Sequence, residues 1–329
     1  MADRLSGDAS LVSVVLVTWN SAPYLPRCLD GVLGQTHAAI QLIVVDNAST
    51  DDSVAVVQIQ APRARMIRND SNRGFSAAVN QAIAVARGEF VQLANPDAFL
   101  EPEYVARLVA GLEHAGPKYG AATGKLLKAD GFEIVPTKRL DSRGIAMTRS
   151  GRHFDIGQGD PDGGPTANIE IFGVSGAAAL YRMAFLTDVA IDGEIFDEDF
   201  FAFREDADLA WRGRLFGWRG LYVPAAVGYH VRQVTPEKRR SISPEINMHS
   251  VKNRFLLRMK NEGLHLAWKN APWETLRDLL VLAASLTIER TSFPAFVWLL
   301  RNRKRVLAKR RAIQKRRVVS DRELARWFR

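Results

Sequence analysis

The chain has 329 residues, a hydrophobic fraction of 47% and a formal net charge of +9 at pH 7. This length suits one large domain with an appendage, or two domains, and the composition is that of a globular protein with a substantial core. The single cysteine, Cys28, excludes an internal disulfide framework, residues 1–8 lack the apolar region of a signal peptide, and the longest apolar stretch, 279–288, is about half of a membrane span.

The first hundred residues alternate between strand and helix patterns. Aliphatic and β-branched runs predict strands at 11–17, 41–45, 64–68 and 90–93, with amphipathic helices between them. This alternation predicts an α/β fold with a mostly parallel sheet covered by helices on both faces. No Gly-x-Gly-x-x-Gly follows the first strand and the chain has no Gly-Lys-Ser/Thr step, which argues against a dinucleotide dehydrogenase and a P-loop protein.

Polar side chains follow three of these strands. Thr18 and Asn20 follow the first, Asp46 follows the second, and Asn95 and Asp97 follow the fourth. Ligands of open α/β sheets collect at the carboxyl ends of strands. The Asn-Pro-Asp step is either an ordinary turn that closes a strand or a carboxylate that holds a divalent cation against a nucleotide diphosphate. Three polar clusters at one edge of a sheet favour the second interpretation.

The middle of the chain is less regular. Residues 105–112 have a helical pattern and residues 121–128 have the pattern of a strand. Residues 140–166 are rich in Gly, Asp, Arg and Pro, and within this region residues 160–165 are predicted to form a mobile surface loop.

A second polar group lies between residues 195 and 212, where aromatic and acidic residues alternate. A helix is predicted to start near Glu205. Acidic residues in a first turn favour the helix dipole, which is one explanation of Glu205 and Asp206; the other is a general base beside an aromatic wall. His230 follows two predicted extended segments, 220–224 and 226–230, and is either structural or a metal ligand.

Five motifs together resemble a known family. They are Val-Thr-Trp-Asn (17–20), Val-Val-Asp-Asn-Ala-Ser-Thr-Asp (44–51), Asn-Arg-Gly-Phe (72–75), Asn-Pro-Asp (95–97) and Phe-Phe-Ala-Phe-Arg-Glu-Asp-Ala-Asp-Leu (200–209). Their order and separation resemble the inverting family 2 glycosyltransferases of the GT-A fold. Within that family the chain looks most like bacterial rhamnosyltransferase-type members that build lipopolysaccharide or cell-wall glycans.

The resemblance implies a role for particular residues in binding a nucleotide. Asp46 would accept the N3–H of a uracil or thymine ring, and Thr18 and Asn20 would line the same pocket. The remaining residues expected at the nucleotide are Arg73, Gly74, Asn80 and Asn95.

The resemblance also implies a metal site and a base. Asn95 and Asp97 occupy the Asp-x-Asp position of the family, and the Asn leaves Asp97 as the main carboxylate ligand of Mg²⁺ or Mn²⁺. His230 matches a position that ligates the metal in some relatives. Asp206 matches the catalytic base, with Glu205 as its neighbour.

The function implied is metal-dependent, inverting transfer of a sugar, L-rhamnose, from a dTDP or UDP donor to a lipid-linked glycan acceptor in cell-surface polysaccharide synthesis. UDP-galactose and UDP-N-acetylglucosamine donors are the alternatives within the family. From another class, the alternative is a membrane- or nucleic-acid-binding module with an inactive α/β scaffold. We expect residues 1–235 to form the transferase domain and residues 236–329 to form a helical appendage.

The positive charge is concentrated in this appendage. Residues 301–317 hold ten Lys or Arg and no acidic residue, so the rest of the chain is close to neutral. Trp and Phe residues precede this run, and a predicted helix at 247–259 carries Lys252, Arg254 and Arg258, which either bind acceptor phosphates or form a solvated face. At about 1 kcal/mol per basic residue, ten residues suffice for reversible attachment to an anionic membrane. We expect a peripheral protein on the cytoplasmic face of the membrane; an oligomer interface ranks second and nucleic acid a distant third.

Overall fold

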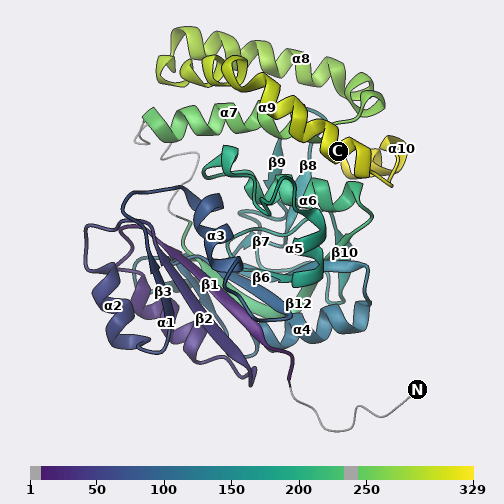
Figure 1. The fold of residues 1–329 in the computed structure, drawn as a ribbon. Helices are drawn as coiled ribbons and strands as arrows, with labels where there is room; N and C mark the ends of the chain where they lie inside the picture. The colour runs from purple at the N-terminus through teal and green to yellow at the C-terminus, as the bar shows by residue number, and fades with distance from the viewer. Residues whose placement is uncertain (1–8, 233–243) are drawn as a thin grey trace.

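The computed structural model describes residues 9–232 and 244–329. A ten-stranded mixed sheet forms its centre, helices cover both faces of the sheet, and a layer of C-terminal helices stacks beyond α6 at one end (Figure 1). The elements of the first half are β1 (Val12–Thr18), α1 (Leu25–Leu33), β2 (Ile40–Asp46), α2 (Ser53–Gln60), β3 (Arg65–Arg68), α3 (Phe75–Ile83) and β4 (Phe90–Ala94).

The first half confirms the predicted parallel arrangement. β1 pairs in parallel with β2 and with β4, and β2 pairs in parallel with β3. Side chains of β1 alternate between two hydrophobic clusters: Val14 and Leu16 pack with α1 and α4, and Val15 packs with α3. Both faces of β1 are therefore buried, which explains why its sequence is a continuous apolar run.

The second half adds mostly antiparallel strands and returns to the sheet through β12. Its elements are β5 (Ala98–Leu100), α4 (Tyr104–Ala115), β6 (Tyr119–Asp130), β7 (Val135–Ser142), β8 (Ile145–Met147), β9 (His153–Asp155), β10 (Ile169–Ile171), β11 (Ala179–Arg182), α5 (Met183–Val189), the 3-10 turn η1 (Glu198–Phe200), α6 (Glu205–Leu215) and β12 (Arg219–His230). The strand order is β10-β12-β6-β11-β4-β1-β2-β3, with β5 on β12 and β7 on β6.

The predicted surface loop at 160–165 lies outside the named helices and strands and is exposed. The glycine-rich region before it contains the end of β7 and the small β8–β9 hairpin, whose three-residue strands are too short to show an alternating pattern. One expectation about this half is wrong in detail. The two extended segments predicted at 220–224 and 226–230 are one strand, β12, whose register on β6 shifts between Val223 and Val227. Pro224 lies at this irregularity, where a residue without an N–H is tolerated.

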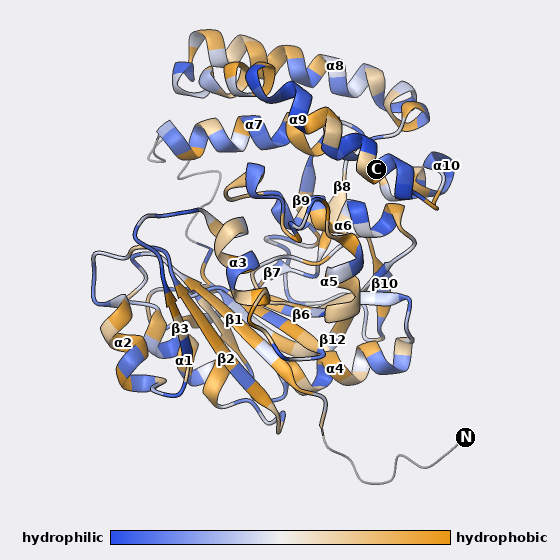
Figure 2. Cartoon of the chain, in the orientation of Figure 1, coloured by the Kyte–Doolittle hydropathy of each residue, from blue (hydrophilic) through white to orange (hydrophobic). Residues whose placement is uncertain are grey.

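The C-terminal helices pack on the side of α6. They are α7 (Pro244–Asn261), α8 (Leu264–Thr287), the 3-10 turn η3 (Arg290–Ser292), α9 (Pro294–Arg316), α10 (Asp321–Leu324) and the 3-10 turn η4 (Ala325–Trp327). A third hydrophobic cluster joins Trp211 of α6, Leu257 of α7 and Val306 of α9. Figure 2 shows apolar residues concentrated in the central strands and a largely hydrophilic α9.

The predicted division at residues 235 and 236 falls outside the described residues, as does the polar link expected around 236–241, and the division stays a prediction. The described helices beyond it share the third hydrophobic cluster with α6. Within the described ranges, no single helix is long and apolar enough to cross a membrane; α8 and residues 290–316 meet that criterion only as a pair bent by 111°.

A buried ion network joins the C-terminal helices to α6. Asp208 of α6 has no exposed surface, and Lys260 Nζ of α7 lies 2.9 and 3.0 Å from its two carboxylate oxygens. Asn261 Nδ2 and Arg212 Nε donate to the same carboxylate at 2.7 and 2.9 Å. Removing one partner of such a buried group leaves an uncompensated charge, so the network fixes α7 against α6.

The network continues through Asp197 to α9. Lys260 also forms an ion pair with Asp197, and Lys309 Nζ of α9 lies 2.7 Å from the other Asp197 oxygen. Burial opposes the charged form of Asp197, but the two lysines outweigh it and hold the pKa of Asp197 below its ordinary value. α7 and α9 are thus tied to the segment that precedes α6.

The basic run is less free than its sequence suggests. Four of its ten basic residues form ion pairs with acidic residues of the same chain; these pairs are Arg305–Asp199, Lys309–Asp197, Arg316–Asp188 and Arg317–Asp321. Pairing within the fold therefore uses part of this charge, and the predicted attachment to an anionic membrane stays a prediction.

Candidate active site

Thr18 and Asp46 lie side by side at the carboxyl ends of β1 and β2, where the sheet register pairs them directly. Both side chains are buried, with Asp46 at 2% exposure. The amide of Ser49 donates to Asp46 Oδ2 at 3.2 Å. Thr18 Oγ1 and Asp46 Oδ1 are buried without a hydrogen-bond partner among the described residues. Leaving buried hydrogen-bond acceptors unpaired costs free energy, so these two atoms are suited to the edge of a bound base that carries an N–H donor.

Asn20 supports the loop beside this pair. Its backbone is in the left-handed region at φ 49°, where Asn is tolerated better than most residues. Its Oδ1 accepts from the amide of Thr50 at 2.8 Å, and its own amide donates to Ser49 Oγ at 3.0 Å. The side chain therefore shapes the loop after β2, and the predicted nucleotide contact stays a prediction.

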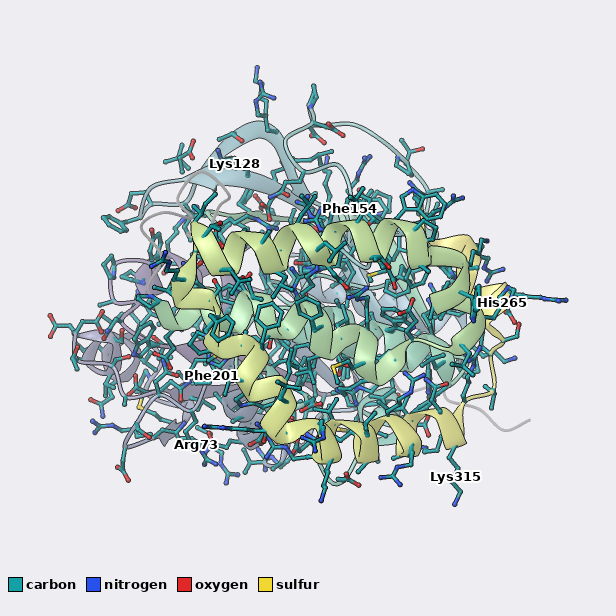
Figure 3. All side chains as sticks on the ribbon, turned by 90° about the horizontal axis from the view of Figure 1, so that it is seen from above. Arg73, Lys128, Phe154, Phe201, His265 and Lys315 are labelled. Carbon is teal, nitrogen blue, oxygen red and sulfur yellow. The ribbon has the colours of Figure 1, made fainter. Side chains whose placement is uncertain are left out.

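Arg73 and Gly74 lie in a loop that is held by Asn47. Asn47 Nδ2 donates to the Gly74 carbonyl at 3.1 Å, and Asn47 Oδ1 accepts from the Arg73 amide at 3.2 Å. Gly74 has φ 82°, and a Cβ there would lie 2.5 Å from the ring of Phe201, so only glycine fits. In Figure 3, Arg73 and Phe201 lie close together on one side of the molecule.

Asn80 and Asn95 form hydrogen bonds with other segments of the chain. Asn80 Nδ2 donates to the Phe196 carbonyl at 2.8 Å, and Asn80 Oδ1 accepts from the Phe196 amide at 2.9 Å. Its amide thus anchors the segment before α6, a role that the sequence did not suggest. Asn95 is half-buried just after β4, and its backbone amide donates to the Ala177 carbonyl at 2.9 Å. The predicted nucleotide contacts of both residues stay predictions.

Asp97 and His230 face each other across the β5–β12 pair, in which His230 lies opposite Ala98. Asp97 Oδ1 is 3.2 Å from His230 Nε2, and both side chains are buried. Asp141 Oδ2 lies 2.9 Å from His230 Nδ1 and fixes the ring orientation. Burial disfavours a charged imidazole, but Asp97 and Asp141 outweigh it and raise the pKa of His230 to about 10.

These two side chains would fit a divalent cation that displaces the proton from His230 Nε2, since only the neutral imidazole ligates a metal. They supply one carboxylate oxygen and one imidazole nitrogen, and Asp141 gives the histidine the outer carboxylate partner that is common around metal ligands. Over residues 9–232 and 244–329, no group of three or more His, Cys, Asp or Glu could hold a metal alone. The protein would thus provide two ligands and leave the remaining positions to a diphosphate and water, as Mg²⁺ sites at substrate phosphates commonly do.

Asp206 lies in the first turn of α6. Its Oδ2 accepts from the amide of Gly176 at 3.1 Å, and its Oδ1 accepts from the amide of Ala207 at 2.7 Å. Burial is the largest effect on Asp206 and raises its pKa above the ordinary value, and the nearby Asp155 adds to this. A carboxylate with a raised pKa and only partial burial suits a general base that works near neutral pH.

Glu205 occupies a different environment from its neighbour. It is 8% exposed, and its Oε2 is buried without a partner among the described residues. Burial, followed by the charge of Asp206, raises the pKa of Glu205 to about 8. Glu205 is therefore mostly protonated at neutral pH and is the weaker candidate for the base.

The loop before Asp206 is strained and is held by α7. Phe201, Phe203 and Arg204 all have positive φ, at 64°, 69° and 70°. Asn253 Nδ2 of α7 lies 2.8, 2.7 and 2.8 Å from the carbonyls of Phe200, Ala202 and Phe203. Strained backbone persists where surrounding structure over-determines it, and here Asn253 supplies that support. No local sequence pattern could have indicated this role.

Asp206 and the Asp97–His230 pair belong to one charged cluster. Arg232 donates to Asp141 at 2.6 Å and forms an ion pair with Asp155 at 2.8 Å. Asp155 in turn acts electrostatically on Asp206. A chain of polar contacts thus runs from Asp97 and His230 through Asp141 and Arg232 to Asp155, which acts electrostatically on Asp206; the sequence interpretation missed the role of Arg232. The structure places Asp46 at the same edge of the sheet, two strands from β4.

Residues 13–189, more than half of the chain, match the family described as Glycosyl transferase family 2. The chain belongs to glycosyl transferase family 2. It is 27% identical over 301 residues to the N-acetylglucosaminyl-diphospho-decaprenol L-rhamnosyltransferase of Mycobacterium tuberculosis (strain H37Rv). This alignment covers 84% of the present chain and 93% of that protein. This family 2 protein is a glycosyltransferase, as its motifs predicted.

Solved glycosyltransferases share the fold of this family 2 protein. GalNAc-T7, solved with UDP, GalNAc and Mn²⁺, has a TM-score of 0.60 at 15% identity over 77% of this chain and 48% of its own. The Pyrobaculum calidifontis mannosyltransferase PcManGT, solved with GDP-Man and Mn²⁺, has a TM-score of 0.53 at 19% identity over 93% and 84%. S. aureus TarS 1-349 has a TM-score of 0.56 at 18% identity over 92% and 88%. The predicted GT-A fold with added C-terminal helices is confirmed.

The raised pKa of Asp206 predicts the pH dependence of transfer. The base works only when deprotonated, so kcat should fall as pH decreases through a pKa above that of an ordinary aspartate, about 3.9. Asp206→Asn should lower kcat by about 10²–10⁴-fold. Glu205→Gln should keep the acidic limb of the profile. A pH–rate profile of the three proteins tests this, and an acidic limb that disappears in Glu205→Gln would assign the base to Glu205 instead.

Proposed function

We propose that the protein transfers L-rhamnose, with inversion, from a dTDP or UDP donor to a lipid-linked glycan acceptor in cell-surface polysaccharide synthesis, and that it needs Mg²⁺ or Mn²⁺. The similarity to a transferase of lipid-linked N-acetylglucosamine across 84% of the chain is the observation that carries the proposal for sugar and acceptor. The Asp97–His230 pair supports the metal requirement. UDP-galactose and UDP-N-acetylglucosamine are the alternative donors.

The residues of the site divide the chemistry between them. Asp46 Oδ1 accepts the N3–H of the donor base, for which it is buried and unpaired among the described residues. Asp97 and His230 hold the cation, which when bound stabilises the charge that develops on the leaving diphosphate. Asp206 takes the proton of the acceptor hydroxyl as that oxygen attacks C1 of the sugar.

One base and one leaving group give a single displacement, which inverts the anomeric centre. A double displacement needs a second ionised carboxylate as nucleophile. Glu205 does not fit this role, because it is buried and its pKa is raised to about 8. The site therefore favours inversion.

The metal role of Asp97 is tested by donor binding. Wild-type protein with Mn²⁺ should bind dTDP-L-rhamnose more tightly than UDP-galactose or UDP-N-acetylglucosamine in calorimetry. Chelation, or Asp97→Ala, should weaken binding at least tenfold, on the order of 1.4 kcal/mol. Asp130→Ala, which removes an exposed carboxylate at the end of β6, is the matched control. Chelator-insensitive binding would refute the cation, and preference for UDP-galactose or UDP-N-acetylglucosamine would refute rhamnose.

Transfer itself is measured with a short-chain N-acetylglucosaminyl-diphospho-polyprenol. The NMR coupling pattern of the new anomeric proton distinguishes inversion from retention. A retained configuration would contradict the assignment of Asp206 as a base in a single displacement.

We further propose that the protein works as a peripheral protein on the cytoplasmic face of the membrane and docks through α8. This helix is amphipathic, but its charged side faces the protein and its apolar side faces outward. Glu274 and Asp278 face inward and form ion pairs with Arg258 of α7. The outward side exposes large apolar residues, namely Leu264, Trp268, Trp273, Leu276, Leu279, Leu280 and Leu286. An exposed apolar helix face, in a helical layer that also exposes Arg301 and Lys304 on α9, matches an interfacial membrane helix.

Charge placed on this face tests the docking. Leu276→Glu with Leu280→Glu should reduce partition onto vesicles containing phosphatidylglycerol at least tenfold, because each leucine would contribute about 1.5–3 kcal/mol when fully buried. Ile59→Glu with Leu33→Glu, on the exposed faces of α2 and α1, adds the same negative charge and should have little effect. Equal loss of vesicle binding in both double variants would show that the effect comes from net charge and not from the face of α8. Ultracentrifugation separates membrane docking from an oligomer interface, because docking alone predicts an unchanged monomer–dimer equilibrium in the α8 variant.

A further inference from the structure

An open apolar groove lies between the start of α7 and the start of α9. It encloses about 430 Å³ and is lined by Met248, Phe293, Pro294, Val297, Trp298, Arg301 and Asn302. Five of these seven side chains are apolar, and Arg301 and Asn302 form a polar border. The groove is large enough for part of a flexible apolar ligand.

A buried cation lies beside the Trp298 wall of this groove. Lys252 of α7 is 2% exposed, and its Nζ is 4.7 Å from the centroid of the Trp298 ring. Its hydrogen-bond partner is His249 Nδ1 at 2.8 Å. Among the described residues, none places a carboxylate within ion-pair distance of Lys252. Burial is the largest effect and lowers the pKa of Lys252 to about 8. A buried ammonium that lacks a paired anion is costly and favours an anionic ligand.

The three basic residues that the sequence places together on α7 have different surroundings. Arg254 and Arg258 form ion pairs with Asp278 of α8, and Arg258 also pairs with Glu274. Their charge is used within the helical layer. Arg305 of α9 lies with its guanidinium carbon 5.6 Å from the same Trp298 ring. The cations nearest the groove are therefore Lys252, Arg301 and Arg305.

The groove leads towards the loop that precedes the base. The ring of His249 stacks on Phe201 with centroids 4.5 Å apart. Phe201 in turn packs against Gly74 of the predicted nucleotide loop. Figure 3 shows Phe201 at one end of the helical layer, whereas His265 and Lys315 lie at the other. An anion beside Lys252 is thus separated from the transferase site by two aromatic rings.

We infer that this groove binds the isoprenoid diphosphate of the acceptor, with the isoprenoid on Val297, Phe293 and Trp298 and the diphosphate near Lys252. The inference rests on the proposed function, since it specifies how a lipid-linked acceptor is held. An apolar groove beside a buried cation without a paired carboxylate suits a ligand that has both an apolar chain and an anionic group. Neither a free sugar nor an uncharged lipid would use both features.

Geranylgeranyl diphosphate is a suitable probe, used below its micelle-forming concentration in calorimetry on the full chain. Wild-type protein should bind it at least tenfold more tightly than inorganic diphosphate or geranylgeraniol. Lys252→Met, which removes the charge and keeps most of the length of the side chain, should weaken binding at least tenfold. Val297→Asp should do the same through the half-buried wall of the groove. Lys315→Met, which changes an exposed lysine near the end of α9 that does not line the groove, should alter binding less than twofold.

Binding of dTDP with Mn²⁺ to wild-type protein is measured in parallel and separates the two proposals. If dTDP binds but the probe binds equally to wild type, Lys252→Met and Val297→Asp, the inference is overturned and the proposed function is untouched. If the probe depends on both residues but dTDP does not bind, the groove stands and the proposed dTDP donor fails. Displacement of the probe by phosphatidylglycerol vesicles would assign the groove to bulk lipid and overturn the inference. Because Val297 is half-buried, its variant gives an answer even if Lys252→Met does not fold.

Discussion

The pairing of Asp208 with Lys260 is the interaction on which the rest of the structure depends. Asp208 lies two residues after the proposed base, has no exposed surface, and is bound by a lysine and an asparagine of α7. A buried carboxylate without these partners would be strongly destabilising. The C-terminal helices therefore do more than cover the transferase fold, since the helix that presents Asp206 is stable in its position only when α7 is packed against it.

The same physical rule explains the unusual distribution of polarity in the helical layer. Charged side chains of α8 point inward because α7 presents Arg254 and Arg258, and these need buried acids. The apolar side chains of α8 are then left on the outside. A fold that satisfies its ion pairs internally thus exposes an apolar face, and the groove at Lys252 is the place where this internal pairing is incomplete. Both features suit a protein that meets a lipid-linked anion at a membrane.

The sequence predicted the first sheet strands, the edge at which the polar residues gather, and the family, because each rests on local periodicity or on short motifs. It did not predict Asp141 or Asn253. Asp141 is 89 residues from the histidine that it orients, and Asn253 is about 50 residues from the carbonyls that it binds. Contacts of this kind leave no periodic signal, since either residue alone looks like an ordinary polar side chain. The ion pairs of the basic run were not foreseen for a similar reason, because Asp188, Asp197 and Asp199 lie more than 100 residues from the basic residues that they bind.

The support of the base by α7 is tested most directly by Asn253→Ala, measured as kcat for transfer and as KM for the donor. Asn253 donates to three carbonyls of the strained loop, and it lies in the helix that holds Asp208. The account predicts that kcat falls at least tenfold while the donor KM changes less than threefold and the protein stays folded by circular dichroism. An unchanged kcat in a folded variant would contradict it, and so would a loss confined to KM.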